Sequence, residues 1–397
     1  GGSKQEKRRA DEEVIQRIEV GIEKAMQENQ KLPDNAACIL PGSEFKIQLT
    51  DVTPRFSRQY NIPEAWKGKV LERVKEWEEK GWVRELKGEK NLWNTPLWAV
   101  PKKSGGKVDP SDIRLCMDLR GVNAQTKEEE YILPLVSDMV AKLRGAKFFT
   151  ELDLSAAFHQ IRVDEKTSRI LGFTTPDSRQ MVWERMPFGP KNACTHFQKI
   201  AEWATLECRD FLVNYVDNFL IASVTPEEHI DRVSKVIACL TKAGFKLNPK
   251  KCKVGYTRIQ FMGHVLDGES RAVDKFKVEQ LEKMRRPKTG KQVESFLGFV
   301  NFLRDFVPRY ADITAPLEKL RKLKSLEGHW GDEHDKAFKK LKEVIREAPI
   351  LSQPDWNSEF RVATDASQTG VGAVLYQETA GGKKRYIEFA SKALQAG

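Results

Sequence analysis

The sequence predicts a folded protein of two to three domains that combines α-helices with β-strands. Its 397 residues are enough to bury several hydrophobic cores. A composition of 40% hydrophobic and 31% charged residues excludes an intrinsically disordered chain. Apolar residues recur at helical spacing in some segments and form short strand-like runs in others, so both kinds of element are expected.

The first half of the chain alternates helical and strand-like patterns. The predicted elements are a charged leader helix at 5–30 that Pro33 ends, a helix at 63–81, strands at 97–100 and 113–117 around a polar loop at 102–112, and a strand at 147–152. The leader has only a weak apolar stripe (Val14, Ile18, Val20, Ile22), so we expect it to pack loosely on the body.

The second half continues this alternation and then changes to strands. The predicted elements are a helix at 192–206, a hairpin at 210–223, a helix at 227–243 closed by Gly244, a strand at 261–265, an amphipathic helix at 291–307, and strands at 359–364, 373–376 and 386–390 with a glycine-rich turn at 370–372. No apolar run reaches the ~18 residues of a membrane span.

Charge and cysteine usage narrow the functional class. Residues 271–324 contain 14 Lys and Arg against 7 Asp and Glu, so this stretch carries +7 of the net charge of +10. Such a basic stretch suits a polyanion, nucleic acid above all, although a solvated helical surface would have the same composition. The six cysteines show no C-x-x-C spacing, which argues against a zinc knuckle and a disulfide framework and favours a reducing compartment.

Three segments contain the candidate chemistry: ELDLSAAFHQI at 151–161, MPFGPKNACTHFQ at 186–198 and VNYVDNFLIAS at 213–223. Each has a structural alternative. Asp153 could cap a helix, Phe158 could be a core residue, and Asp217-Asn218 could be turn residues. A carboxylate at a strand end together with another at a hairpin tip is, however, how proteins hold Mg²⁺ for phosphate chemistry.

In their order and spacing these segments resemble motifs A, B and C of the reverse transcriptases of gypsy-type LTR retrotransposons. The resemblance covers roughly residues 45–375 and includes PLWAVPKKSGGK, IRLCMDLRGVN, GFKLNPKKCKV, FMGHV, SFLGFVNFLRDFVPRYADITAPLEKL and TDASQTGVGAVLYQ. It implies an α+β right-hand polymerase with a truncated ribonuclease H-like C-terminal segment. The implied regions are the leader (1–33), mainly fingers (34–145), mainly palm (146–267, with a fingers insertion at about 162–185), thumb (268–327), and a linker with the ribonuclease H-like segment (328–397).

The resemblance also implies roles for single residues at the polymerase site. Asp153 and Asp217, with the backbone of Leu154, would hold two Mg²⁺ ions, for which Mn²⁺ could substitute. The nucleotide-binding set would be Lys102 or Lys103, Arg114, Phe158, Phe188 and Gly189, with Phe158 as the steric gate against a ribose 2′-OH. Lys251 could donate a proton to the leaving pyrophosphate.

The implied macromolecular substrate is an RNA–DNA hybrid or a DNA primer on an RNA template, with deoxynucleoside triphosphates as the second substrate. The implied nucleic-acid-binding residues are Tyr215, Phe261, Met262, Gly263, His264, Arg285, Arg286, Gly298 and Phe302. Gly298 could instead serve close helix packing. We expect no membrane partner and an intracellular location, in the cytoplasm, in a virus-like particle or in the nucleus.

The chain departs from the family at the end of motif C, where Asn218 stands in place of the second aspartate. An amide can ligate Mg²⁺ but carries no charge, so we expect strongly impaired polymerisation. The alternatives are a catalytically inactive, retroelement-derived nucleic-acid-binding protein and a protein whose leader helix docks a partner. Asp365 resembles the first ribonuclease H carboxylate, and because its acidic partners would lie beyond residue 397, no ribonuclease H activity is expected.

Overall fold

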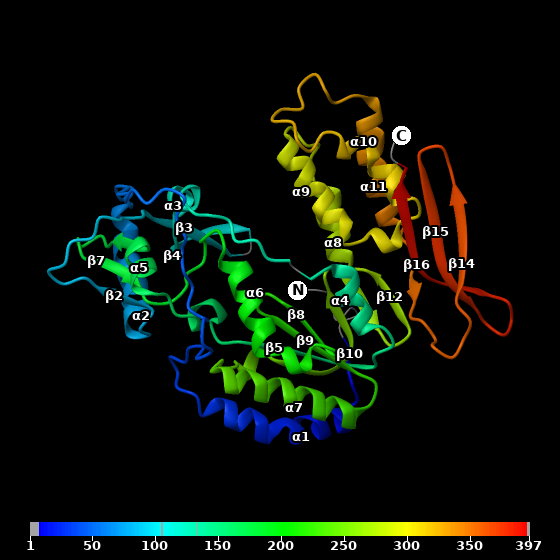
Figure 1. Ribbon diagram of the computed structural model, residues 1–397, viewed down its shortest axis with the longest axis horizontal. Helices are drawn as coiled ribbons and strands as arrows, with labels where there is room; N and C mark the ends of the chain where they lie inside the picture. Colours follow the sequence, from blue (N-terminus) through cyan, green and yellow to red (C-terminus); the bar gives the residue numbers. More distant parts are fainter. Residues whose placement is uncertain (1–7, 105, 133, 395–397) are drawn as a thin grey trace.

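The computed structural model describes residues 8–104, 106–132 and 134–394, and it divides into a palm, fingers, a thumb and a C-terminal sheet (Figure 1). The palm is an antiparallel sheet in the order β13-β12-β11-β10-β5-β9-β8, with β1 paired to β10. Its strands are β1 (Arg8–Arg9), β5 (Phe148–Asp153), β8 (Leu212–Tyr215), β9 (Asn218–Ser223), β10 (Lys253–Phe261), β11 (His264–Asp267), β12 (Ser270–Val273) and β13 (Leu351–Ser352).

Alternating side chains of β9, which lies between β5 and the edge strand β8, enter different hydrophobic cores. Phe219 and Ile221 join the large core that α6 (Ala193–Ala204) and α7 (Pro226–Ala243) complete, whereas Leu220 and Ala222 join a smaller core with α4 (Val136–Leu143). Successive residues of a strand point to opposite faces, so a continuous apolar run is required where both faces are covered. This explains why the 210–223 hairpin was predictable from its apolar run.

The leader forms α1 (Glu12–Gln30), which packs along α7 (Figure 1). A Cβ on Gly21 would lie 2.6 Å from the Ile230 side chain, so the two helices are in close contact. The Asn29 side chain donates to the Phe245 carbonyl (2.8 Å) and accepts from the Leu247 amide (2.8 Å). The expectation of loose packing is therefore wrong, and the apolar face that a docking partner would need is covered by α7.

The stripe predicted for α1 is also shifted. Ile15, Ile18 and Ile22 are the buried apolar residues of the helix, whereas Val20 is 64% exposed and Val14 is half-buried. Residues 15, 18 and 22 follow the i, i+3, i+7 spacing of one helix face. Ile15 was not included in the predicted stripe, which had therefore mixed two faces of the helix.

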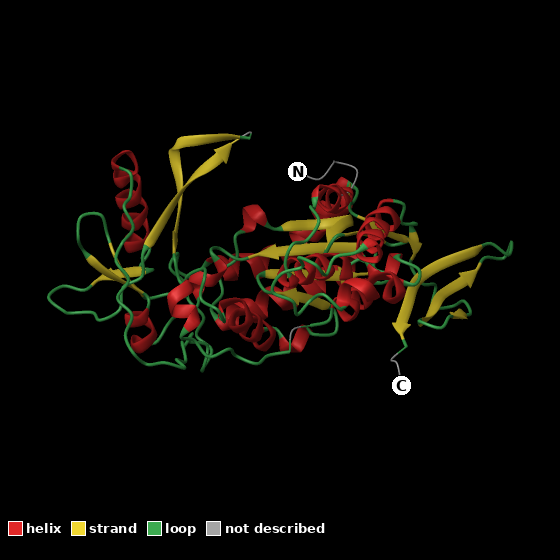
Figure 2. Ribbon diagram, turned by 90° about the horizontal axis from the view of Figure 1, so that it is seen from above, coloured by secondary structure: helices red, strands yellow, loops and turns green. Residues whose placement is uncertain are grey.

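The fingers contain a small sheet, β2-β7-β6, and a separate hairpin, β3-β4, that projects from the body (Figure 2). Their elements are α2 (Glu64–Glu79), β2 (Val83–Glu85), β3 (Leu97–Ser104), β4 (Lys107–Met117), α3 (Arg120–Ala124), α5 (Glu165–Ile170), β6 (Gly172–Thr174) and β7 (Gln180–Trp183). The strands of the hairpin extend through most of the polar loop expected at 102–112, because the chain keeps pairing out to Ser104 and Lys107.

The thumb is a helical unit with its own hydrophobic core. It comprises α8 (Lys275–Lys283), α9 (Gly290–Asn301), η4 (Arg304–Phe306), α10 (Tyr310–Glu318) and α11 (Asp332–Arg346). The helix expected at 291–307 ends at Asn301, and a separate 3₁₀ turn carries Phe306 into the core. Because α11 shares this core, the boundary expected at residue 327 falls inside the thumb.

The chain continues into a three-stranded antiparallel sheet of β14 (Arg361–Ala366), β15 (Gly370–Glu378) and β16 (Lys384–Ala393). Residues 370–372, expected as a turn, begin β15 instead, and the turn lies just before them. Strand β16 lies against α10 and β13, so this sheet is attached to both thumb and palm. Among the described residues, no helix is both long enough and apolar enough to cross a membrane.

Candidate active site

The tip of the β8–β9 hairpin brings the motif A and motif C residues together. Asp153 at the end of β5 lies directly opposite Asn218 on β9, and Tyr215, half-buried at the end of β8, pairs with Asn218 from the other side. The two-residue turn contains Val216 and Asp217, and Val216 has a φ of +54°. This left-handed conformation is strained for a β-branched residue by about 1–3 kcal/mol, so the surrounding structure must hold it.

Gln198 of α6 supplies that support. Its side chain is fully buried, its Oε1 accepts a hydrogen bond from the Val216 amide, and its Nε2 donates to the Asn214 carbonyl at 2.8 Å. Both partners belong to the β8–β9 hairpin, so one side chain fixes the turn that presents Asp217. Sequence reasoning missed this role, since nothing in the local pattern distinguishes Gln198 from an ordinary helical residue.

The strand register brings the two carboxylates to the same end of the sheet, because Asp217 precedes Asn218, the residue opposite Asp153. Burial raises the pKa of Asp153, and the negative charge of Asp217 raises it further, while Lys251 and Lys253 act in the opposite direction. Asp217 and Asn218 are exposed, whereas Leu154 is buried. Two carboxylates that repel each other form a site that a cation would stabilise. The Asn218 amide adds an oxygen donor without charge.

Phe158 is a core residue, and its role as a steric gate stays a prediction. Its ring is 6% exposed and stacks on the buried ring of Phe197 with centroids 5.3 Å apart. It also stacks on Phe188, which is 64% exposed, at 5.1 Å. Phe158 therefore joins the palm core to an exposed aromatic surface. It is a core residue that touches the exposed ring of Phe188.

Three of the six predicted nucleotide-binding residues line one cavity of about 500 Å³. They are Lys102 and Arg114 from the β3–β4 hairpin and Phe188, whereas Lys103, Phe158 and Gly189 are not among its lining residues. Lys102 pairs with Asp112 (3.2 Å), which also pairs with Arg73 of α2 (3.2 Å). The Lys102 hydrogen bond lowers the pKa of Asp112.

Gly189 follows Phe188 and has a φ of +110°, a conformation that glycine adopts readily. Its carbonyl accepts a hydrogen bond from the Asn123 side chain at 3.0 Å, and the same side chain accepts from the Lys191 amide at 2.8 Å. Asn123 therefore fixes the loop between Phe188 and α6. Asp112, Arg73 and Asn123 are supporting residues that sequence reasoning did not identify, since their partners are distant in the sequence.

A tight turn replaces the strand expected at 261–265. Phe261 pairs with His264, and the two residues between them, Met262 and Gly263, both have positive φ (+50° and +79°). We refer to these four residues as the 261–264 turn. Its His264 ring hydrogen-bonds through Nε2 to the Phe302 carbonyl at 2.7 Å, at the end of α9. The turn is thus attached to the thumb.

The thumb presents the remaining predicted residues. Gly298 is exposed, and a Cβ there would meet no atom within 4 Å, so close helix packing does not explain this glycine. Phe302 follows one turn later, at the end of α9. Arg285 and Arg286 are exposed, and Arg286 lies 5.0 Å over the ring of Trp330.

Two charged residues that the sequence marked as functional form ion pairs with the thumb. Arg271, counted in the basic stretch, is only 1% exposed and pairs with Asp305 at 3.0 Å, so it is not available to a polyanion. Asp365, on β14, is exposed, but its carboxylate accepts a hydrogen bond from Arg309 of the thumb at 2.7 Å. Counting charges cannot separate a buried ion pair from a binding surface.

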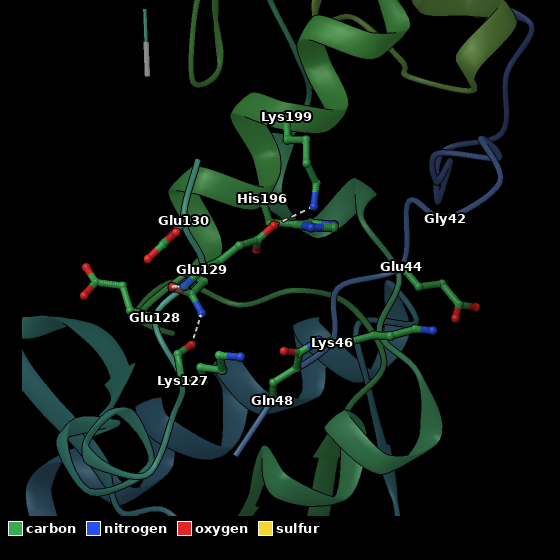
Figure 3. Close-up of a pocket in the computed structure, with 11 residues that line it drawn as sticks. Gly42, Glu44, Lys46, Gln48, Lys127, Glu128, Glu129, Glu130, His196 and Lys199 are labelled. Atoms are coloured by element: carbon green, nitrogen blue, oxygen red, sulfur yellow. Dashed lines mark hydrogen bonds and ion pairs between the residues drawn. The ribbon is translucent and has the colours of Figure 1, made fainter. Parts of the chain in front are cut away.

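A second cavity, of about 520 Å³, lies between segments 42–48 and 127–130 and the α6 helix (Figure 3). Side chains of both signs line it, and Lys199 pairs with Glu129 at 2.5 Å. Asn192 also lines this cavity. Its side-chain amide donates a hydrogen bond to the Lys127 carbonyl at 2.8 Å and so connects α6 to segment 127–130. Since Glu44, Glu128, Glu129 and Glu130 line this cavity together with lysines, it does not present the uniform positive field that would attract a polyanion.

Comparisons with known proteins agree with this geometry. Residues 100–266 match the family "Reverse transcriptase (RNA-dependent DNA polymerase)", and residues 330–397 match an "RNase H-like domain found in reverse transcriptase". The chain is 32% identical over 333 residues to the retrovirus-related Pol polyprotein from transposon 297 of Drosophila melanogaster, covering 83% of this chain and 31% of that protein. It is 31% identical over 343 residues to the transposon Tf2-7 polyprotein of Schizosaccharomyces pombe, covering 85% and 25%.

Solved structures support the fold. A foamy viral protease-reverse transcriptase in complex with double-stranded DNA superimposes with a TM-score of 0.72 at 23% identity, over 98% of this chain and 66% of that one. The same viral protein in complex with an RNA/DNA hybrid gives a TM-score of 0.68. The right-hand α+β architecture is thereby confirmed. This chain spans a third or less of the curated polyproteins it matches. By its sequence and its fold, the chain belongs to the reverse transcriptase family of retrotransposon Pol polyproteins.

Proposed function

We propose that this chain acts as an RNA-directed DNA polymerase, adding deoxynucleotides to a DNA primer paired with an RNA template. The observation that carries the proposal is the strand register that sets Asp153 opposite Asn218 and beside Asp217. The cavity lined by Lys102, Arg114 and Phe188 supports it, since it offers two cations and an aromatic ring to one ligand. An intracellular location accompanies this function.

Enzymes of this family generally use divalent metals, and we propose two Mg²⁺ ions, with Mn²⁺ as a substitute. The donors fit a hard cation: the carboxylates of Asp153 and Asp217, the Leu154 carbonyl and the Asn218 amide are all oxygen ligands. Burial raises the pKa of Asp153 and so disfavours its bare carboxylate, which a bound cation would stabilise. When bound, the metal would polarise the phosphate and stabilise the attacking and leaving oxygens.

The other residues of the site bind and orient the nucleotide. Lys102 offers a point charge, and Arg114 a planar fork, for the triphosphate. The Phe158 ring, stacked under Phe188, would occupy the volume of a ribose 2′-OH. Lys251 lies close enough for its charge to lower the pKa of Asp153, and it would protonate the leaving pyrophosphate.

The primer–template would lie between the palm and the thumb. Arg285 and Arg286 would contact backbone phosphates, and Gly298 with Phe302 would follow the minor groove. The 261–264 turn and Tyr215 would hold the primer end. These contacts are mostly to phosphate and sugar, so binding should depend little on sequence.

The Asn218→Asp variant tests the proposal in primer extension on an RNA template. The original chain has two carboxylates where the family has three, which would remove about 3–4 kcal/mol of transition-state stabilisation. Asn218→Asp restores the third, so this variant should extend primers roughly 100- to 1,000-fold faster than the original chain. Asn357→Asp adds the same charge at an exposed loop and serves as the matched control. Equal rates for the original chain and Asn218→Asp would show that the third carboxylate is dispensable.

A non-catalytic nucleic-acid-binding role is the second candidate. It is favoured by Asn218 itself, because the proposed binding surfaces of the thumb and fingers do not include this residue. If Asn218→Asp binds the hybrid tightly and still fails to extend primers, this second role becomes the better account. Under both candidate functions, the original chain and Asn218→Asp should bind deoxynucleotides with similar affinity.

A further inference from the structure

Arg271 is the most deeply buried charge in the described part of the molecule that the proposed chemistry does not use. Its backbone lies in the palm sheet, on β12, where it pairs with Leu266 of β11 and Leu351 of β13. Its side chain leaves the palm. One guanidinium nitrogen donates to Asp305 of the thumb at 3.0 Å, and another donates to the Ile387 carbonyl of β16 at 3.1 Å.

The same guanidinium reaches the 261–264 turn through one aromatic ring. It lies 5.5 Å from the centroid of Phe306, and the His264 ring meets Phe306 edge-on with centroids 5.2 Å apart. His264 ends the turn and is also bonded to the Phe302 carbonyl. Phe306 is fully buried between these two residues, so a shift of Arg271 is transmitted to the turn by packing.

A second arginine strengthens the junction on the palm side. Arg144, which follows α4, pairs with Glu388 of β16 at 2.8 Å, and Arg271 approaches the same carboxylate at 3.8 Å. Glu388 adjoins Ile387, so one short stretch of β16 is held by Arg144 and Arg271. The sheet is tied to the thumb as well, because the Ala311 amide donates to the Ser391 hydroxyl at 2.8 Å.

We propose that Arg271 is a positioning residue for the primer end, and that the C-terminal sheet takes part in polymerisation by holding it. This inference rests on the proposed polymerase function. A buried cation is retained only where several partners satisfy it, and the planar fork of arginine can join Asp305, Ile387 and the Phe306 ring at once. Lysine, a point charge on a flexible stem, cannot hold all three. The palm turn, the thumb and the β14–β16 sheet are therefore connected through one side chain.

The test uses an RNA–DNA hybrid with 2-aminopurine at the primer 3′ end, bound to the full chain in the Asn218→Asp background. Fluorescence at saturating protein reports how the terminal base is held, and titration gives the Kd. Single-turnover extension reports chemistry. The variants are Arg271→Met and Arg271→Lys. The control is Arg346→Met, which removes an ion pair between α11 and α8 within the thumb (2.7 Å to Glu282).

We expect Arg271→Met to bind the hybrid with nearly the parent Kd, while its terminal-base fluorescence changes and its extension rate falls by up to about 100-fold, as a misplacement of about 1 Å can cause. Arg271→Lys should recover part of both signals. Arg346→Met should resemble the parent in both. Parent-like fluorescence and rate in Arg271→Met would overturn the inference and leave the polymerase proposal intact.

Two other outcomes are also decisive. If the parent itself fails to bind the hybrid, the proposed function falls, and this inference falls with it. If circular dichroism shows that Arg271→Met is unfolded, Glu388→Gln replaces it, because that side chain is 26% exposed and the variant keeps an acceptor for Arg271. A smaller change in the same fluorescence, at an unchanged Tm, is then expected; an unchanged signal refutes the inference.

Discussion

The rings of Phe158 and Phe188 stack with centroids 5.1 Å apart and planes inclined by 29°. Phe158 is buried, whereas Phe188 is exposed and lines the cavity that also contains Lys102 and Arg114, so the pair connects the palm core to that cavity. Phe197 supports Phe158 from the core side at 5.3 Å. A side chain held on two sides cannot yield easily to a larger sugar, which gives the steric-gate hypothesis a physical basis.

Replacing Phe158 by valine should relax the choice of sugar. In the Asn218→Asp background, Phe158→Val removes the ring from the proposed 2′-OH volume, so ribonucleotides should compete for incorporation. The measurement is the ratio of kcat/KM for deoxy- and ribonucleotides. The lost stacking should also destabilise the fold by about 1–3 kcal/mol. An unchanged ratio, with only the stability lowered, would assign Phe158 to the core alone.

Reversing the charges of Arg285 and Arg286 should weaken hybrid binding equally for all sequences. Each phosphate contact contributes about 0.9 to the slope of log K against log salt, so loss of two contacts should lower the slope by about 2. Fluorescence anisotropy over a salt series measures this. Lys24→Glu with Lys242→Glu, on α1 and α7, makes the same charge change behind the palm. Equal slopes for the two double variants would reject the thumb surface.

Gln198→Met should disable catalysis more than it destabilises the chain. The substitution leaves the Val216 amide and the Asn214 carbonyl without their partner, at a cost of about 1–3 kcal/mol, and frees the strained turn before Asp217. Extension by the Asn218→Asp chain should fall sharply.

The matched control for Gln198 is Gln377→Met, because Gln377 of β15 is also buried and bonds the backbone of Asp355, which precedes the C-terminal sheet. It should lose similar stability while keeping its extension rate. If the two variants lost activity in proportion to their Tm, the Gln198 contact would have no particular role in the turn.

Acidification should destabilise the fold between about pH 6.5 and 4. Burial lowers the pKa of His159, His229 and His264 to about 4. In this window the unfolded chain binds more protons than the folded one, so stability is full above pH 6.5 and is lost as the pH falls. Each histidine lowers the free energy of unfolding by up to about 1.4 kcal/mol for each pH unit of acidification in this window.

Denaturant unfolding at several pH values measures this slope. His264→Gln keeps a donor for the Phe302 carbonyl and removes one titrating group, so it should flatten the pH dependence by about one proton. Arg271 and Asp305 also face His264, with opposite effects on its pKa. A slope equal to that of the parent would mean that His264 is not held neutral by burial.

The sequence was most informative where local pattern and local structure coincide. The helices now seen as α2, α6 and α7 were predicted within a few residues, since start and stop residues such as Pro63 and Gly244 mark their ends. The 261–264 turn was missed because Phe261 and Met262 continue an apolar run. Nothing in the run signals the positive φ of Met262, which only the strand pairing reveals.

Residues whose role depends on distant partners were the least predictable. Asp153 and Asp217 could be found because Asp153 ends a strand and Asp217 lies at a hairpin tip between two apolar strand halves. Gln198 and Arg271 could not, because their partners are set by tertiary structure: Ile387 is 116 positions from Arg271. The basic stretch accordingly combined exposed arginines with one that is part of a buried junction.

The pairing of the first helix with the palm has a consequence for how the chain folds. Asn29 of α1 is bonded to Phe245, 216 positions later. At about 5–20 residues per second, a ribosome needs roughly 10–40 s to synthesise the intervening chain. During that time Ile15, Ile18 and Ile22 have no partner helix to cover them. During synthesis the first helix therefore exposes its apolar face for a long interval. Aggregation through this face competes with folding of the palm.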